Sequence, residues 1–595
     1  MRNRTIQKGD RMEETSPRLT ATDANIGADI SKIDSRVDSA VDSDVTANGD
    51  SNDDRLSWGD TVFLHLERED MPLNVASVCM FDREIPFQQC VRFVESKLPR
   101  IPRYLKRIAP APLGVGLPRW EFDQRFDIRN HVREDTLKRG SDAELKALAG
   151  KIFSTVLDRQ RPLWDLTLVH GLKGNRSALI VRLHHCLADG IAGVGIMHAL
   201  LDPTSDTPRL PRRKLKIPST PAQSVLTSLT SGLVDSYSDL IQRLLDGYVD
   251  LSSMAGRLAA NGGKPPEGEF SNLLPEINLS AERLRFNVLY RGPQRFAWAE
   301  IPLAEIKAIK CACGTHVNDV ILTLLTATIQ RYLELHGDSV KDRQFRMMIP
   351  VNLRGNDSPG QLGNRISLVP VTIPLDIRDL RKLLAMVHER TELLKRTHAA
   401  ELVSLAGGWL SMIPNSAQAL AGHVISRLPF TPFNMVCTNV PGPQYPLYLL
   451  GRKLLHCYPY VPIGGEMALN CAILTYNGTA HFGFSGEVHA VPDLTRLESL
   501  LKSSFAELRE ASLVRSQRKE IEKPAKMSRT KARSKANVDA KPKSRTRPKM
   551  KVATPLSGPD SPASAASTIR PVDSAESAAA TPAVVVEKVV PQFIA

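Results

Sequence analysis

An apolar run that ends in two histidines constrains the fold of this chain more than any other segment. SALIVRLHH (177–185) has the length and continuous apolar character of a buried strand, and the Gly-rich segment GIAGVGIMHALL (190–201) reads as an apolar helix. A strand followed so closely by a helix favours an α/β fold. The junction, HHCLADG, consists of His184, His185, Cys186, Leu187, Ala188, Asp189 and Gly190.

The rest of the body shows the same mixture of strand and helix patterns. LNVASVCMFD (73–82) has the β-branched, apolar character of a strand, whereas 142–158 and 316–335 have the apolar spacing of amphipathic helices. A Pro- and Arg-rich stretch at 202–223 has the composition of a linker. The chain has 595 residues, more than the roughly 250–300 at which one core stops growing. We therefore predict two α/β domains of similar size joined by a long crossover.

The two ends of the chain differ from this body in charge and composition. Residues 1–55 hold 8 basic and 12 acidic side chains, and residues 516–551 hold 14 basic and 3 acidic ones. Neither end has the periodic apolar residues that would offset the entropy lost on ordering, so we expect both to be disordered. The predicted segments are a disordered acidic extension (1–55), a first domain with the histidine motif (56–205), a crossover with an amphipathic helix (206–280), a second domain (281–512) and a disordered tail (513–595).

HHCLADG is the strongest candidate for chemistry. A neutral imidazole has a pKa near 6.5 and can remove a hydroxyl proton close to neutral pH, and the end of a strand is a rigid place from which to do so. A single histidine at such a position is more often structural or solvated, and the pattern does not show which of His184 and His185 points inward. The pair followed by xxxDG is much more specific.

Other catalytic or metal-binding signatures are missing from the sequence. It has no GxSxG nucleophile elbow, no GxxxxGK[ST] phosphate loop and no HExxH metal motif. Of its eight cysteines only Cys311 and Cys313 are close together, too few for a zinc site or a disulfide framework. We therefore expect no metal and no cofactor, and a direct transfer rather than a covalent acyl-enzyme.

Several blocks in order along residues 56–510 resemble one known family. HHCLADG resembles the HHxxxDG motif of the bacterial wax ester synthase/acyl-CoA:diacylglycerol acyltransferases, relatives of chloramphenicol acetyltransferase and of condensation domains. The further blocks are LSWGDTVFLHLE (56–67), where the usual LSPLD-like start is altered, RPLWDLTLVHGL (161–172) with a PLW motif, VNDVIL (317–322) with an ND motif, MMIPVNLRG (347–355), LGNRIS (362–367) and TNVPGPQYPLYLLG (438–451).

The resemblance implies a fold and a set of residue roles. The fold would be two chloramphenicol acetyltransferase-like domains, each a mixed sheet with flanking helices. His185 would be the general base that deprotonates the acceptor hydroxyl, with His184 supporting orientation or substrate contact. Asp189 would hold the local architecture and Gly190 would allow the turn. The expected walls of the substrate site are Trp164, Asn318 and Asp319, with a structural role for them the stronger alternative, and Asn439 is the candidate oxyanion donor.

The implied substrates are acyl-CoA, as co-substrate, and diacylglycerol or a long-chain alcohol. The sequence contains no run of about 18 apolar residues, the length that a membrane-spanning helix needs. We therefore expect a cytoplasmic protein bound peripherally to the inner face of the membrane or to lipid bodies. Two segments could make that contact. From 402 to 451 the only formally charged side chain is Arg427, and the basic segment 516–551 could contact anionic head groups. The alternative for 402–451 is a segment of the protein core, and the alternative for 516–551 is a merely solvated tail. Nucleic acid is a weaker candidate partner, because 516–551 has no aromatic residue for base stacking.

The leading interpretation is an O-acyltransferase that makes triacylglycerol, with wax ester synthesis as a second activity. A non-catalytic lipid-body coat of the same fold is an alternative, although such a scaffold has no need of a base at a strand end. A polyketide-type or condensation-type acyltransferase is a further alternative, which the lack of a carrier domain makes less attractive.

Overall fold

The computed structural model describes residues 54–110, 117–187, 190–206, 215–218, 280–352, 366–397 and 431–513. Apart from Leu513, these residues belong to one compact unit. The predictions for both tails, for most of the crossover and for the first 29 residues of the segment 402–451 lie outside the described residues.

The first sheet has six strands in the order β11-β12-β1-β6-β5-β4. All neighbouring pairs are antiparallel except β4 and β5, which are parallel. The strands are β1 (Asn74–Phe81), β4 (Val132–Thr136), β5 (Trp164–Leu172), β6 (Arg176–His184), β11 (Tyr448–Leu449) and β12 (Arg452–Tyr460). A separate ribbon pairs β2 (Lys106–Ala109) with β3 (Arg119–Phe122). Two strands of this sheet therefore come from a segment more than 240 residues beyond β6 in the sequence.

In the described part of the chain, four α-helices accompany the first sheet: α2 (Trp58–Leu66), α3 (Phe87–Lys97), α4 (Asp142–Phe153) and α5 (Gly190–Leu200). Short 3-10 turns lie at Leu98–Arg100, Pro102–Leu105 and Ile128–Asn130. The buried face of α3 packs on one face of the sheet, where alternate residues of β1, β5 and β6 form an apolar core. The opposite face carries a second core that includes α4.

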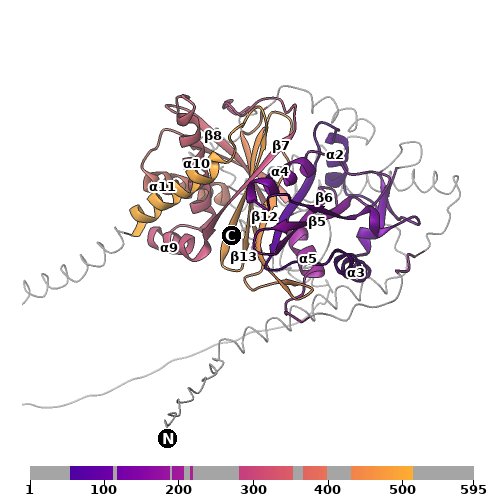
Figure 1. Ribbon diagram of the computed structural model, residues 1–595. Helices are drawn as coiled ribbons and strands as arrows, with labels where there is room; N and C mark the ends of the chain where they lie inside the picture. The colour runs from indigo at the N-terminus through magenta and orange to yellow at the C-terminus, as the bar shows by residue number, and fades with distance from the viewer. Residues whose placement is uncertain are drawn as a thin grey trace, which may run out of the picture. The chain divides into compact units, whose positions relative to one another are not determined.

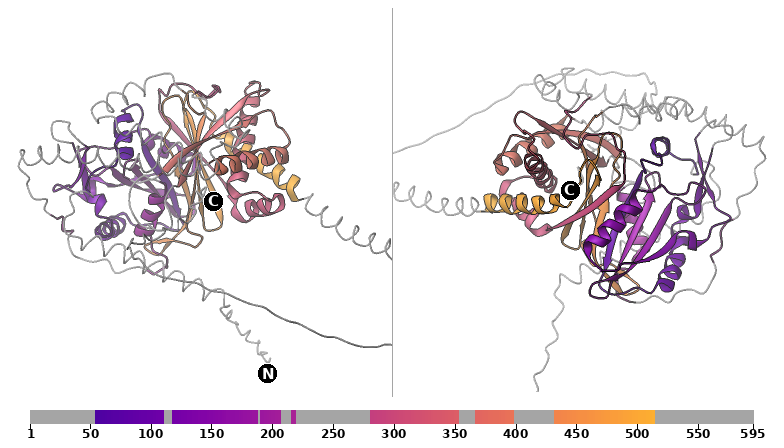
Figure 2. Two further views of the ribbon diagram at one scale, coloured as in Figure 1. Left: turned by 180° about the vertical axis from the view of Figure 1, so that it is seen from behind. Right: turned by 45° about the horizontal axis from the view of Figure 1, so that its top comes forward.

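The second sheet also has six strands, in the order β7-β14-β13-β10-β8-β9. Its central pairs β13–β10 and β10–β8 are parallel and the outer pairs are antiparallel. The strands are β7 (Gln294–Pro302), β8 (Gln344–Asn352), β9 (Ile366–Pro374), β10 (Met435–Pro441), β13 (Leu469–Tyr476) and β14 (Thr479–Glu487). The helices are α9 (Leu303–Cys313), α10 (Val317–Leu335), α11 (Leu380–Arg396) and a last helix over 496–513. All four contribute to one large core and cover one face of this sheet (Figures 1 and 2).

The two sheets meet through α4 and β12. Side chains of α4 share a core with Phe296 and Trp298 of β7 and with Tyr458 and Tyr460 of β12. The approach of β12 to β14 is very close, because a Cβ built on Gly483 would lie 1.8 Å from the carbonyl oxygen of Pro459. Any side chain at that position would clash with Pro459, so the glycine allows this close approach of the two sheets.

The structure confirms the predicted fold class, two mixed sheets with flanking helices, and most of the predicted elements. The strand at 73–82 is β1, the strand at 177–185 is β6, and the helix at 316–335 is α10. The helix predicted over 142–158 is wrong in its last five residues, since α4 ends at Phe153. The reason is tertiary: Arg182 of β6 donates hydrogen bonds to the carbonyls of Ile152 and Thr155, which replaces further helical hydrogen bonds.

Candidate active site

The histidine pair lies where β6 ends, in a turn that backbone hydrogen bonds hold on both sides. The amide of His184 donates to the carbonyl of Leu163 on one side (3.0 Å), and the amide of His185 donates to the carbonyl of Leu73 on the other (2.9 Å). The amide of Leu187 closes the turn onto the carbonyl of His184. Both histidines are therefore fixed at the rigid end of a central strand.

His185 keeps part of its surface exposed, while its Nδ1 atom is shielded from solvent. Its ring stacks on Phe63 of α2, with ring centroids 3.9 Å apart and planes 12° from parallel. Burial, together with the nearby His184, lowers the pKa of His185 to about 4, against a weaker opposing effect of its own backbone. The imidazole is consequently neutral at physiological pH.

His184 is completely buried, and its two nitrogens have different surroundings. Nδ1 accepts a hydrogen bond from the amide of Cys186 (3.1 Å), so a neutral ring carries its proton on Nε2. That Nε2 lies 3.4 Å from Oε1 of Glu67, the residue that follows α2. The tautomer and the orientation of His184 are thus set by one backbone amide and one carboxylate.

Glu67 is itself held by several groups. Its Oε1 accepts a hydrogen bond from the amide of Leu73 (3.1 Å), and its Oε2 pairs with Arg159 (3.0 Å). Burial alone would raise the pKa of Glu67, but His184, the Leu73 amide and Arg159 together lower it below its ordinary value. Glu67 therefore stays ionised behind His184.

The remaining residues of the motif are only partly visible. Asp189 lies outside the described residues, so its predicted role stays a prediction. Gly190 is the first residue of α5.

Trp164 begins β5 and is buried in the core beneath α3. Its indole N–H donates to the carbonyl of Tyr104 (2.8 Å), and its ring stacks on His131 at 4.5 Å. Its polar group is therefore already used within the fold, as a structural residue requires.

Asn318 and Asp319 lie in the first turn of α10, in the helix layer of the second sheet. The Asp319 carboxylate accepts hydrogen bonds from the amide of His316 (2.9 Å), from Nδ1 of His388 (2.7 Å) and from Oγ1 of Thr391 (2.7 Å). It caps α10 and joins it to α11, while Asn318 is buried beside it. Burial would raise the pKa of Asp319, but these donors lower it.

Asn439 lies on β10, a strand that contacts α5, the helix that follows the histidine motif in the sequence. The side chain is buried, and within the described ranges neither its oxygen nor its nitrogen has a hydrogen-bond partner. A buried amide with both atoms unbonded is costly unless another group supplies the partner. Asn439 is thus a candidate residue whose side-chain donor is unused within the described ranges.

Two family models match the chain. The wax ester synthase/diacylglycerol acyltransferase catalytic domain matches residues 56–321, and the C-terminal domain of the same family matches residues 362–509. Together they match well over half of the chain. The chain belongs to the wax ester synthase/diacylglycerol acyltransferase family. Because one of the two models is that of the catalytic domain, we describe the protein as an acyltransferase of this family.

Individual relatives agree with this assignment. Two Mycobacterium tuberculosis proteins named probable diacylglycerol O-acyltransferase are similar over 76% of this chain: tgs1 at 26% identity over 94% of its length, and tgs2 at 28% identity over 98%. The solved wax ester synthase/diacylglycerol acyltransferase of Marinobacter aquaeolei VT8 is 24% identical, with a TM-score of 0.53 over 77% of this chain and 99% of that one. The last similarity shows that the two proteins share a fold.

Sequence reasoning missed three supporting residues of this acyltransferase: Phe63, Glu67 and Arg159. The signal was present in LSWGDTVFLHLE, which contains Phe63 of α2 and, four residues on, Glu67 directly after the helix. The contact to the histidines depends on how α2 packs against β6, which no local pattern reveals.

Among the helices that the structure describes, none combines the length and the apolar character that a membrane-spanning segment needs.

Two groups of side chains among the described residues could hold a metal ion: Glu300 with His456 and His481, and His316 with Asp319 and His388. Both lie outside the histidine motif. The carboxylate of the second group already accepts hydrogen bonds from both of its histidines, from the His316 backbone and from Thr391.

Proposed function

We propose that this acyltransferase moves a fatty acyl group from acyl-CoA to the hydroxyl of diacylglycerol or of a long-chain alcohol, with His185 as the general base. The observation that carries the proposal is the position of the His185 imidazole, held in a rigid turn with Nδ1 shielded and part of the residue exposed. A base of this kind typically contributes about 10²–10⁴-fold to the rate.

The reaction proceeds by direct attack. Nε2 of His185 takes the proton of the acceptor hydroxyl as the oxygen attacks the thioester carbonyl carbon. The carbon–sulfur bond then breaks, and the imidazolium returns the proton to the CoA sulfur as the free thiol leaves. The Glu67–His184 pair keeps the turn in position throughout, and Asn439 is the candidate donor to the developing oxyanion.

His185→Ala tests the assignment of the base, with His170→Ala as a matched control. His170 lies on β5 of the same sheet and pairs with surface glutamates rather than with the motif. Thiol release from acyl-CoA is followed with diacylglycerol and a long-chain alcohol in separate reactions. We expect His185→Ala to lose at least about 10²-fold in kcat and His170→Ala to stay near wild type. Full activity in a folded His185→Ala protein would remove His185 from the role of base.

We also propose that the protein associates peripherally with membranes or lipid bodies, where both acyl donors and lipid alcohols accumulate. The strongly basic composition of 516–551 supports an electrostatic contact with anionic head groups. Sedimentation with anionic liposomes at low and high salt, for the full chain and for a chain ending at residue 512, tests this. Equal binding of both chains at low salt would contradict a contribution from the tail.

A further inference from the structure

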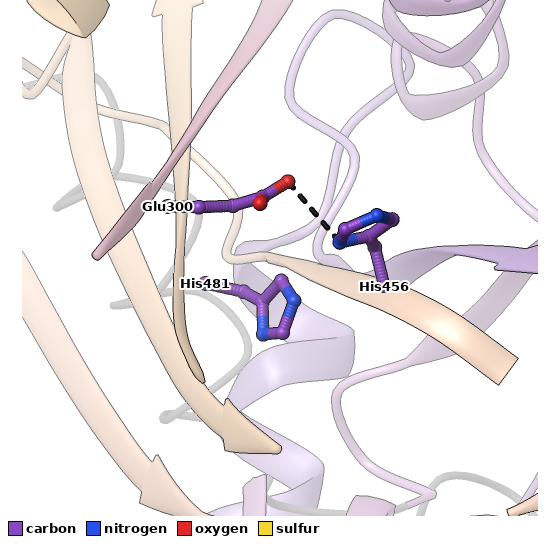
Figure 3. A group of neighbouring side chains, drawn as sticks. All are labelled: Glu300, His456 and His481. Atoms are coloured by element: carbon purple, nitrogen blue, oxygen red, sulfur yellow. Dashed lines mark ion pairs between the residues drawn. The ribbon is translucent and has the colours of Figure 1, made fainter. Parts of the chain in front are cut away.

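Three side chains from three strands converge where the two sheets meet. Glu300 of β7 and His481 of β14 are direct cross-strand partners, and His456 of β12 faces them from the first sheet. Figure 3 shows the Glu300 and His456 side chains pointing toward each other, with the His481 ring beside them. We call these three residues the strand-crossing cluster.

His481 is the member whose environment calls for a ligand. It is 0% exposed, and neither of its ring nitrogens has a hydrogen-bond partner in the described part of the chain. The equally buried His184, by contrast, accepts a backbone hydrogen bond. A buried imidazole with both nitrogens unbonded is uncommon in folded proteins and calls for an explanation.

The distances in the cluster suit a metal ion. Nδ1 of His456 lies 3.2 Å from Oε1 of Glu300, and one potential ligand atom from each residue lies within 4.8 Å of the others. Bonds of about 2.0–2.2 Å in a tetrahedral site place ligand atoms roughly 3.3 Å apart. The first pair already has this separation, and the potential ligand atom of His481 lies within 4.8 Å of the other two.

The surroundings provide support and access. The hydroxyl of Tyr458 donates a hydrogen bond to Oε1 of Glu300, and its ring stacks on Trp298 at 4.6 Å. Such an outer partner orients a ligating carboxylate. The side chains of His456 and Glu300 are 32% and 36% exposed, so an ion can enter from solvent and the fourth position is open to water.

We propose that Glu300, His456 and His481 bind a divalent cation of the zinc class and thereby join the two sheets. Two imidazoles and one carboxylate are a common donor set for Zn²⁺ with one open position. Met80 of β1 pairs with His456, whereas Asn74 pairs with His184, so the cluster lies about 20 Å along the sheet from the histidine pair. The ion is therefore a structural link, and the acyl-transfer step does not pass through it.

Metal binding to the tag-free full chain tests the proposal. Chelator-stripped protein is titrated with Zn²⁺ against a competing chromophoric chelator, and with Co²⁺, whose visible absorption bands report tetrahedral coordination. The variants are His481→Ala, His456→Ala and Glu300→Gln. The controls are His388→Ala, which lies beside the carboxylate of the other candidate group, and His185→Ala, which removes a histidine of the catalytic motif.

We expect one Zn²⁺ per chain, tetrahedral Co²⁺ bands, and a Zn²⁺-dependent rise in Tm. Each variant of the cluster should weaken Zn²⁺ binding at least 100-fold and abolish the rise in Tm, while both controls bind as wild type. His481 is buried, so His481→Ala could unfold the protein. The His456→Ala and Glu300→Gln variants are therefore decisive, because both positions are partly exposed. Wild-type affinity in folded His456→Ala and Glu300→Gln, or no stoichiometric binding by the wild type, would overturn the proposal.

Discussion

Replacing Glu67 with glutamine probes how the histidine pair is held. The substitution keeps the size of the side chain but removes the negative charge between Arg159 and His184. It also places an amide nitrogen where one carboxylate oxygen accepts a hydrogen bond, either from the Leu73 amide or from Arg159. The variant therefore disturbs the support of the motif without touching His185.

The magnitude follows from burial. Hydrogen bonds to charged groups contribute about 1.5–3 kcal/mol each, and breaking a buried pair costs about 3–5 kcal/mol. The Glu67 side chain is 2% exposed, but that of Arg159 is 49% exposed, so water can rehydrate the guanidinium after the substitution. We therefore expect a loss of about 2 kcal/mol in the free energy of unfolding. A shift of the reacting imidazole by a fraction of an ångström should reduce kcat by roughly 10–100-fold.

Asp165→Asn is the matched control. Asp165 and Arg182 form an ion pair on neighbouring strands, with side chains only 5–8% exposed, and within the described residues no hydrogen bond or ion pair joins either side chain to His184. Its loss of stability should equal or exceed that of Glu67→Gln, while its kcat should stay within about twofold of wild type.

The two variants are compared by denaturant unfolding and by thiol release from saturating acyl-CoA. A Glu67→Gln enzyme with normal kcat, or an Asp165→Asn enzyme with the same loss of kcat, would refute the idea that Glu67 acts through the histidine pair.

Three further predictions concern the base, the α10 cap and the contact between the sheets. Because the pKa of His185 is about 4, the imidazole stays unprotonated down to about pH 5, and kcat/KM should be flat between pH 5.5 and 7.5; a several-fold loss near pH 6 would contradict the lowered pKa. Asp319→Ala removes the acceptor shared by His316, His388 and Thr391 and should cost about 2–4 kcal/mol in unfolding experiments; a stable but inactive variant would instead place Asp319 at the substrate. Gly483→Ala forces a methyl group onto the Pro459 carbonyl and should lower stability by at least about 3 kcal/mol. The control is Gly195→Ala, because a Cβ on exposed Gly195 meets no atom within 4 Å, and equal stability of both alanine variants would refute the close contact.

Much of the local structure was readable from the sequence, because it depends on short-range periodicity. The apolar run before His184 could bury both faces only as a central strand, and the spacing of Val317, Ile321 and Leu325 could only suit a buried helical face. The ordered motif blocks carried the family for the same reason, since each is a contiguous stretch of residues.

The support of the histidines was decided by packing. The sequence places Glu67 more than 110 residues before His184, and it is the docking of α2 against the end of β6 that brings them within 3.4 Å. Likewise α4 ends at Phe153 because the guanidinium of Arg182, from a strand later in the sequence, donates hydrogen bonds to the carbonyls of Ile152 and Thr155. Propensity within the segment 142–158 contains no information about that partner.

The contact between the sheets shows the same division most clearly. Residues 448–460 lie in the second half of the sequence, yet they complete the first sheet, and this exchange brings His456 to Glu300 and His481. Glu300, His456 and His481 are too far apart in the sequence to form a motif that a search could detect. HHCLADG can be recognised because its members are neighbours in the chain. The sequence by itself determined the residues whose chemistry depends on adjacent positions, and the tertiary structure alone decided those whose chemistry depends on strands meeting across a sheet.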